Sequence, residues 1–232
     1  MRRSAVQALK LTEAPSRLRE RAYESFREQL LAKRLRPGQF VSQRELVQLT
    51  GLTLAAIREM IPRLEADGLI VTVPQRGLQI VPVDAKLIRS AFQLRRMIER
   101  EAMIEFLRRA DKKEIEALHT ELESVLSRVA GGDVSPRVLD AAQRVDWGFH
   151  DRLVESLDNP IVTQIYRVNS LKIRLIRLEQ SLILADNALS ALGEHRAILE
   201  AMRTGDVAAA VATLDAHIHS SLLRTLGVSQ AG

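Results

Sequence analysis

Along the first third of the chain, the hydrophobic pattern changes from helical spacing to short β-rich runs. Apolar positions in residues 16–35 recur every three or four residues, which predicts a helix with Ser16 as its N-cap. The sequence RPG at 36–38 ends this helix. Further on, the runs LIVTV and GLQIV flank the sequence PQR, and two such runs about a tight turn predict a β-hairpin.

A helix-turn-helix pattern lies between the first helix and the hairpin. A short helix begins after Ser42, and Glu45 completes a capping box with that serine. Gly51 makes a tight turn, and a second helix runs from Thr53 until Gly68 closes it. Helix, helix-turn-helix and hairpin follow one another in the order of a winged helix-turn-helix module.

From Asp84 onwards the pattern is helical almost throughout and contains no strand pattern. The predicted helices span residues 84–109, 112–129, 137–157, 160–185, 188–203 and 206–226. The sequence VPVD at 81–84 joins the two parts. We therefore predict a mainly α protein with a winged helix-turn-helix DNA-binding domain over residues 1–82 (core 17–82). An all-α antiparallel helical bundle, the effector domain, follows over residues 83–232.

Composition agrees with a helical protein and excludes several chemistries. The 232 residues are 46% hydrophobic but only 3% aromatic, so the core must be built from Leu, Ile, Val and Ala. The absence of cysteine excludes disulfides, thiolate nucleophiles and Cys-bound metals, and it fits a reducing compartment. No apolar run approaches the ~18 residues of a membrane span, and the N-terminus lacks the apolar core of a signal peptide. We expect a soluble cytoplasmic protein that does not enter a membrane.

Charge is distributed unevenly between the two parts of the chain. Residues 1–83 carry 14 Lys and Arg against 8 Asp and Glu, which gives +6. Residues 84–232 carry 20 against 21, which gives −1. A basic first third suggests a module that faces an anionic polymer, and nucleic acid is favoured over a merely basic, solvated surface.

The second helix of a helix-turn-helix places its first residues on base edges in the major groove. In this chain those residues are Thr53, Leu54, Ala55 and Ala56, and Arg58 follows one turn later. Arg58 can reach a guanine edge or a phosphate, and Arg44 on the preceding helix is placed for a phosphate or groove contact.

The tip of the predicted hairpin adds a further candidate contact with DNA. Gln75 and Arg76 occupy this wing, and Gly77 allows a close approach. Each arginine alone could be an ordinary surface residue, but three arginines on one module favour DNA contact.

The stretch LRPGQFVSQRELVQLTGLTLAAIREMIPRLEADGLIVTVPQRGLQIV resembles the winged helix of the GntR-type bacterial transcription regulators. The PG, REL and LEADGL segments and the Arg-Gly wing match in order, over most of residues 17–82. The family commonly carries an arginine, often a base reader, where this chain has Leu54. That departure implies apolar contact or reliance on Arg44 and Arg58. Pro62 removes the hydrogen bond to the Arg58 carbonyl and predicts a kink in the second helix.

A second constellation of polar residues lies in the helical part. Asp146 and His150 share one face of a predicted helix, within or at the edge of its apolar stripe, and His195 lies on the apolar stripe of another. Asp146 has no obvious lysine or arginine partner, which favours a metal, although a simple Asp146–His195 pair remains an alternative. On the last helix, periodicity cannot choose between His217 and His219.

The arrangement D-x-x-F-H…EHR-x-I-L-E-A-M…GD…H is similar to the all-helical FCD domain of the FadR subfamily of GntR regulators, with its six-helix VanR-like variant as a possible form. The resemblance covers about residues 84–226. It implies that a divalent metal is held by Asp146, His150, His195 and His217, and that His219 is a surface or outer residue. Three imidazoles and a carboxylate suit zinc, which we expect, with nickel, manganese or iron as alternatives.

In regulators of this type the effector is a small organic acid beside the metal. The resemblance assigns Arg95, within R-x-x-x-E, as a clamp for its carboxylate. Arg174 is a further candidate, and Tyr166 and Asn169 are possible polar lining.

We therefore interpret the chain as a metabolite-responsive transcription regulator, a repressor that binds a palindromic double-stranded operator as a homodimer. One alternative is a metal-dependent hydrolase with an accessory DNA-binding module. It lacks an evident general base, because Glu194 precedes His195 by one residue and should point elsewhere. Another alternative is a DNA-binding regulator whose metal is purely structural.

Overall fold

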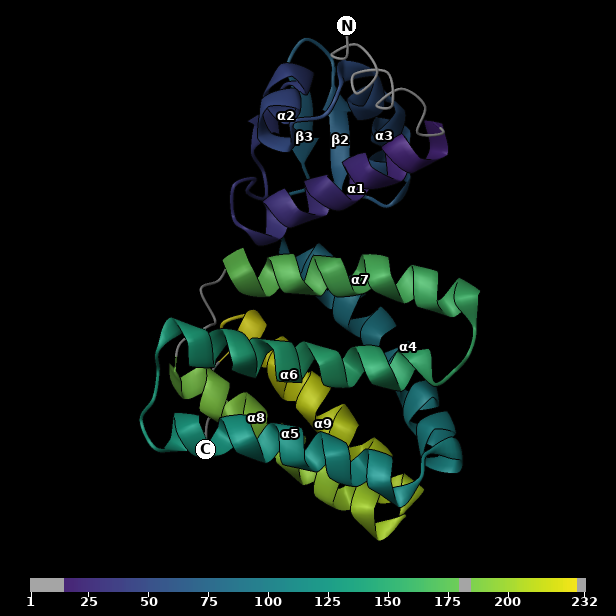
Figure 1. Cartoon of the computed structure of the whole chain (residues 1–232), viewed down its shortest axis with the longest axis vertical. Coiled ribbons are helices and arrows are strands. Elements are labelled where there is room, and N and C mark those ends of the chain that lie inside the picture. The colour runs from purple at the N-terminus through teal and green to yellow at the C-terminus, as the bar shows by residue number, and fades with distance from the viewer. Residues whose placement is uncertain (1–14, 180–184, 229–232) are drawn as a thin grey trace, which may run out of the picture. The chain divides into compact units, whose positions relative to one another are not determined.

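The computed structural model describes residues 15–179 and 185–228, and the chain divides into two compact units, residues 1–83 and 84–232. The first unit contains helices α1, α2 and α3 and strands β1, β2 and β3 (Figure 1). Their bounds are α1 Pro15–Leu31, β1 Phe40–Val41, α2 Gln43–Thr50, α3 Leu54–Ala66, β2 Ile70–Val73 and β3 Gly77–Ile80. The strands form an antiparallel sheet in the order β1-β3-β2. This confirms the winged helix-turn-helix.

The helix-turn-helix is fixed by its caps, as the sequence predicts. The Ser42 hydroxyl accepts from the Glu45 amide at 3.2 Å, and the Glu45 carboxylate accepts from the Ser42 amide at 2.6 Å. Gly51 ends α2 with a positive φ of 68°, a conformation that glycine adopts without strain. The Thr53 hydroxyl then caps α3 by accepting from the Ala56 amide at 3.3 Å. The two helices are therefore set by local hydrogen bonds at every junction.

The first helix and the sheet differ from the prediction. Because α1 already includes Pro15, Ser16 is not its N-cap. The helix ends at Leu31 rather than at the RPG sequence, since Lys33 takes a φ of 57° and the Leu35 amide turns back to the Gln29 carbonyl at 3.2 Å. The two-residue strand β1 was not predicted, because so short a run has no readable alternation.

α3 runs as one helix through Pro62, and the kink expected there stays a prediction. The core of the first unit is apolar. It includes Phe26, Leu30, Leu46, Ile57, Met60 and Leu64, each at most 1% exposed.

The second unit is all-helical in its described residues, which confirms the predicted fold class. The bounds are α4 Ala85–Arg109, α5 Lys112–Ala130, α6 Pro136–Glu155, α7 Pro160–Glu179, α8 Ala185–Thr204 and α9 Val207–Thr225. The predicted helix over 160–185 runs too far, because α8 already begins at Ala185, and residues 180–184 lie outside the described residues.

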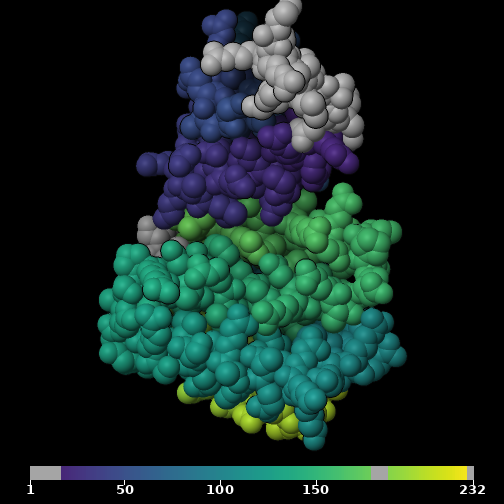
Figure 2. All heavy atoms as spheres, viewed as in Figure 1, coloured from purple at the N-terminus to yellow at the C-terminus, as the bar shows by residue number. Residues whose placement is uncertain are grey.

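Helices α4, α6, α8 and α9 pack against one another around the core of this unit. α6 lies between α5 and α7 (Figure 1), and α9 packs against α4 and α8. Seen as a surface, α5, α6 and α7 cover one face of the unit (Figure 2). No described helix combines the length and apolar character that a membrane span requires.

Candidate metal centre and DNA-reading face

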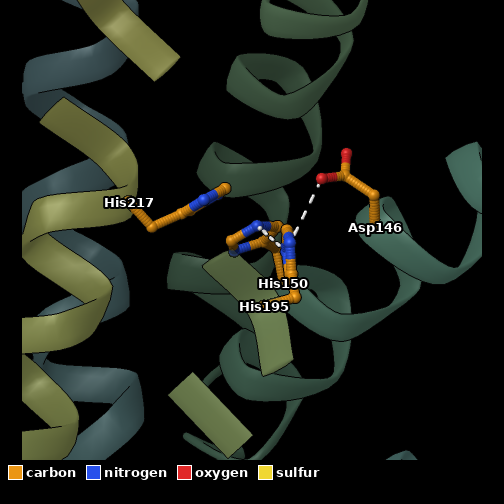
Figure 3. Close-up of side chains that lie close together, drawn as sticks. All are labelled: Asp146, His150, His195 and His217. Atoms are coloured by element: carbon orange, nitrogen blue, oxygen red, sulfur yellow. Dashed lines mark hydrogen bonds and ion pairs between the residues drawn. The ribbon is translucent and has the colours of Figure 1, made fainter. Parts of the chain in front are cut away.

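Four polar side chains from three helices meet inside the helical unit. Asp146 and His150 come from α6, His195 from α8 and His217 from α9, and each is at most 3% exposed. Each offers one ligand atom, and these atoms all lie within 4.8 Å of one another (Figure 3). The predicted inward orientation of Asp146, His150 and His195 is therefore confirmed, and His217 rather than His219 joins them. His219 is exposed.

The imidazoles of His150 and His195 are each fixed by a hydrogen bond from Nδ1. His150 donates from Nδ1 to the Glu99 carboxylate at 2.8 Å, and His195 donates from Nδ1 to the Ala191 carbonyl at 2.8 Å. Carboxylate and carbonyl oxygens only accept, so both rings carry their proton on Nδ1. The two Nε2 atoms lie 3.0 Å apart and both carry a lone pair, and that of His150 accepts from Arg95 Nη2 at 2.5 Å.

His217 repeats this arrangement on the third helix. Its Nδ1 donates to Glu194 Oε2 at 2.7 Å, and Arg224 holds the same carboxylate with two nitrogens at 2.5 and 2.9 Å. His217 Nε2 is buried and has no hydrogen-bond partner. A histidine whose outer nitrogen is fixed by an acceptor presents its other nitrogen as a metal ligand.

Asp146 has a partner that the sequence did not reveal. Its Oδ2 accepts from Arg177 Nη1 on α7 at 2.5 Å, so the expected absence of a basic partner was wrong. The second oxygen, Oδ1, lies 3.5 Å from His195 Nε2, is buried and has no hydrogen bond. The two orphaned atoms, Asp146 Oδ1 and His217 Nε2, are what a bound cation would satisfy.

Electrostatics favour the protonation states that a metal requires. Burial, reinforced by Arg95, lowers the pKa of His150 to about 4, and burial lowers the pKa of His217 to about 3. Burial would raise the pKa of Asp146, but Arg177 and the histidines outweigh it and hold that pKa well below its usual range. Neutral imidazoles beside an ionised carboxylate are the forms that bind a divalent cation.

A buried network joins the cluster to α4. Glu99 is fully buried; its Oε1 accepts from Arg95 Nε at 2.8 Å and from the Tyr166 hydroxyl at 2.5 Å. Arg95 Nη2 also lies 2.5 Å from His150 Nε2. Burial would raise the pKa of Glu99, but Arg95 and His150 lower it to about 2. Glu99, absent from the predicted site, could have been found from its position one turn after Arg95.

The predicted effector residues divide into two groups. Arg95 and Tyr166 reach the cluster through Glu99 and His150, as described above. Asn169 is buried but donates to the Ala91 carbonyl at 2.9 Å, and Arg174 donates to Asp151 at 2.6 Å. No interaction described for Asn169 or Arg174 reaches the four clustered residues.

A small cavity approaches the cluster from the side of Asp146. Its volume is about 30 Å³, room for about two water molecules. The lining is mostly apolar and comprises Leu139, Ala142, Gln143, Asp146, Arg177, Ala188, Ala191 and Leu192.

Most of the predicted DNA-reading residues lie on the surface of the first unit. Thr53, Leu54, Ala55 and Arg58 are exposed on or beside the first turns of α3, and Arg44 is exposed on α2, so these five are accessible to a ligand. The expectation for Ala56 was wrong, because its side chain is buried on the inner face of α3.

The neighbours of these residues set their orientation. Arg58 donates from Nε to Gln43 Oε1 at 3.1 Å. On the wing, the exposed Arg76 lies 3.9 Å over the Phe40 ring. Gly77 has a φ of 95°, and a Cβ there would lie 3.2 Å from the Val41 carbonyl oxygen, so its close neighbour is strand β1.

The two units match two family models. Residues 18–80 match the bacterial regulatory proteins of the gntR family, and residues 90–220 match the FCD domain. The chain belongs to the GntR family. Its FCD domain places it in the FadR subfamily, whose members regulate transcription and are not enzymes.

Individual relatives agree with this assignment. The chain is 25% identical to the uncharacterized HTH-type transcriptional regulator YdhC of Bacillus subtilis (strain 168) over 199 residues, which are 85% of this chain and 86% of that protein. It is similar in fold to E. coli McbR/YncC, with a TM-score of 0.73, 15% identity and coverage of 90% and 97% of the two chains. A putative GntR regulator from Rhodococcus sp. RHA1 gives a TM-score of 0.69, 20% identity and coverage of 93% and 100%.

Membership of a regulator family removes the hydrolase alternative. The position expected for Glu194 also needs correction. Its carboxylate contacts His217 and does not point away from the site. The Glu194 carboxylate accepts from Nδ1 of His217 and does not contact Nε2, so it orients this imidazole.

Proposed function

We propose that the protein is a homodimeric repressor that binds a palindromic operator and is controlled by a small organic acid. In this proposal residues 1–82 bind DNA through Arg44, Thr53, Leu54, Ala55, Arg58, Arg76 and Gly77. Residues 83–232 bind the metal and the effector and form the dimer. The regulator acts in the cytoplasm, where its operator is.

One observation carries the metal part of the proposal. Three imidazoles from three helices meet with Asp146 so that their ligand atoms lie within 4.8 Å of one another, and each imidazole has its Nδ1 fixed by an acceptor. Three neutral nitrogens and one carboxylate oxygen are a ligand set for a divalent ion, for which we propose zinc, with nickel, manganese or iron as alternatives. When bound, the ion would supply open coordination positions for a carboxylate.

Charge around the cluster supports an acidic effector. Arg95 Nη2 lies 2.5 Å from His150 Nε2, and Arg177 Nη1 lies 2.5 Å from Asp146 Oδ2. Guanidinium groups bind carboxylates through paired hydrogen bonds, so an acid at the cluster finds a clamp beside it. Tyr166 would complete the inner lining, and Asn169 and Arg174 are assigned to its outer edge.

Helix α4 offers a route from the effector to the DNA-binding unit. It begins directly after the wing, with Asp84 as its N-cap, and carries both Arg95 and Glu99. Glu99 is hydrogen-bonded to His150, so a change at the cluster acts on α4. A shift of a few kcal/mol between two arrangements of the dimer is enough to change operator affinity strongly.

The test measures operator affinity of the metal-loaded protein with lactate, malate and citrate as probes and lactamide as an uncharged control. We expect at least one acid, but not lactamide, to weaken operator binding. Unchanged affinity at saturating concentrations of all three acids would contradict control by these classes of acid.

A purely structural metal gives a different outcome in a parallel measurement. Chelation would then unfold the helical unit, and none of the three acids would raise the melting temperature of the loaded protein. Under the present proposal, the acid that weakens operator binding also raises that melting temperature.

A further inference from the structure

The start of α3 presents apolar rather than charged side chains. Leu54 and Ala55 are both exposed there, and 38% of the Leu54 surface is accessible. Among the described residues of the first unit, Leu54 and Val71 are the large apolar side chains that are exposed. Leu54 therefore stands outside the core at the position where a helix-turn-helix meets its ligand.

Local geometry holds this turn in place. Thr53 caps the helix through the Ala56 amide, and Ala56, Ile57 and Met60 are buried on the inner face of α3. Since the inner face is anchored, Leu54 at the first helical position is held outward. In a helix-turn-helix the N-terminal residues of the second helix contact base edges in the major groove.

The charged residues near Leu54 are suited to polar contacts with DNA. Arg58 is held at Nε by Gln43, which leaves its two terminal nitrogens for a guanine edge or a phosphate. Arg44 on α2 is exposed and suited to a phosphate. Leu54 can form no hydrogen bond with a base. The apolar group that a base edge offers in the major groove is the C5 methyl of thymine.

We propose that Leu54 reads a thymine methyl group, so that each operator half-site carries an A·T pair opposite the start of α3. Ala55 packs beside it, and Arg58 supplies the neighbouring polar contact. This inference rests on the proposed DNA binding by residues 1–82 but is independent of the metal and the effector.

The experiment begins with selection of binding sequences from a random DNA pool by the full-length protein. Each recurrent thymine of the selected site is then replaced by deoxyuridine, which lacks only the methyl group, and affinity is measured at fixed salt. We expect one position per half-site at which this change weakens binding about fourfold, the factor that corresponds to about 0.8 kcal/mol for one buried methyl.

Two variants assign that methyl contact. Leu54→Ala should bind the thymine and deoxyuridine sites with equal affinity, because the side chain that senses the methyl is gone. Val71→Ala, which shortens the other exposed apolar side chain of this unit, should keep the fourfold difference. Both substitutions are on the surface, and an unchanged melting temperature verifies the fold.

The outcomes separate this inference from the proposed function. If a site is selected but no thymine shows the effect, or if the effect persists in Leu54→Ala, the assignment of Leu54 is wrong and DNA binding stands. If no sequence is enriched at all, the proposed operator binding itself fails.

Discussion

The two units place their candidate functional residues in opposite environments. Those of the first unit, such as Arg44, Leu54 and Arg58, are exposed and have few partners. Those of the helical unit, such as His150 and Glu99, are buried and hydrogen-bonded to one another across helices. Exposed residues can change without disturbing the fold, whereas buried polar residues contribute to binding and to folding together.

This difference gives each unit its own mutational signature. In the first unit, we expect DNA affinity and stability to vary independently. In the helical unit, we expect metal affinity and stability to vary together, because each ligand is also a packed part of the core.

Replacing a clustered histidine should have the largest effect. His195→Ala removes a ligand whose ring is 1% exposed and leaves Asp146 Oδ1 with one neighbour fewer. We expect metal affinity, measured by calorimetric titration, to fall by more than the roughly 10–100-fold typical of an outer partner.

His219→Ala is the matched control on α9, since this histidine is exposed while His217 is buried. Its metal affinity should equal that of the wild type. A large loss of metal affinity in His219→Ala would show that His219, and not His217, is the ligand on α9.

The two carboxylates behind the histidines give a matched pair of variants. Glu99→Gln and Glu194→Gln each keep an oxygen that can accept from a histidine Nδ1 but remove the negative charge that raises the basicity of the ring, so each should lower metal affinity by roughly 10–100-fold. Only Glu99→Gln also leaves Arg95 buried without its counter-charge. Such a loss costs about 3–5 kcal/mol, to be measured by denaturant unfolding.

Glu194 is only half-buried and shares its charge with Arg224, so its variant should unfold nearly as the wild type does. Equal destabilisation by both variants would contradict the special role of the buried network around Glu99.

Acid should destabilise the protein when metal has been removed with a chelator. The pKa of His150 is about 4 in the folded state, against an ordinary value of 6.5. Between pH 6.5 and 4 the unfolded chain therefore binds a proton that the folded chain does not. The contribution of His150 to the free energy of unfolding is fully present above pH 6.5. It decreases by roughly 3 kcal/mol as the pH is lowered towards 4.

Thermal melts of the chelated protein across this range measure the effect. The His150→Gln variant, which has no imidazole to protonate at this position, should show a smaller slope. An equal slope in both proteins would assign the acid sensitivity to other groups.

Arg58→Ala should change DNA binding alone. The lost guanine or phosphate contact costs about 1–3 kcal/mol of operator affinity. Arg58 is exposed, and among the described residues its hydrogen bond is to Gln43 through Nε, so the melting temperature should stay at the wild-type value. An Arg58→Ala variant that loses both operator affinity and stability would contradict the expectation that the two vary independently in the first unit.

Much of the fold could be predicted because its signals are local. The capping box of Ser42 and Glu45 and the glycines that end helices lie within a few residues of what they determine. The positions of Asp146 and His150 on one helical face follow from spacing alone. The choice of His217 over His219 needed the resemblance, because both lie equally far from the centre of the apolar stripe.

The partners of these residues could not be predicted, because helix packing decides them. Arg177 meets Asp146 only because α7 packs beside α6, and 31 positions separate the two residues. Glu194 reaches His217 because α8 and α9 pack together. A sequence pattern specifies which face of a helix is buried, but not which side chain of another helix it meets.

Native mass spectrometry of the protein purified without added metal shows whether the four clustered residues hold an ion. The wild type should carry one divalent ion per chain, and His195→Ala prepared in parallel should carry none. A wild type with only the mass of its chain, or an ion retained in His195→Ala, would contradict a metal centre built from Asp146, His150, His195 and His217.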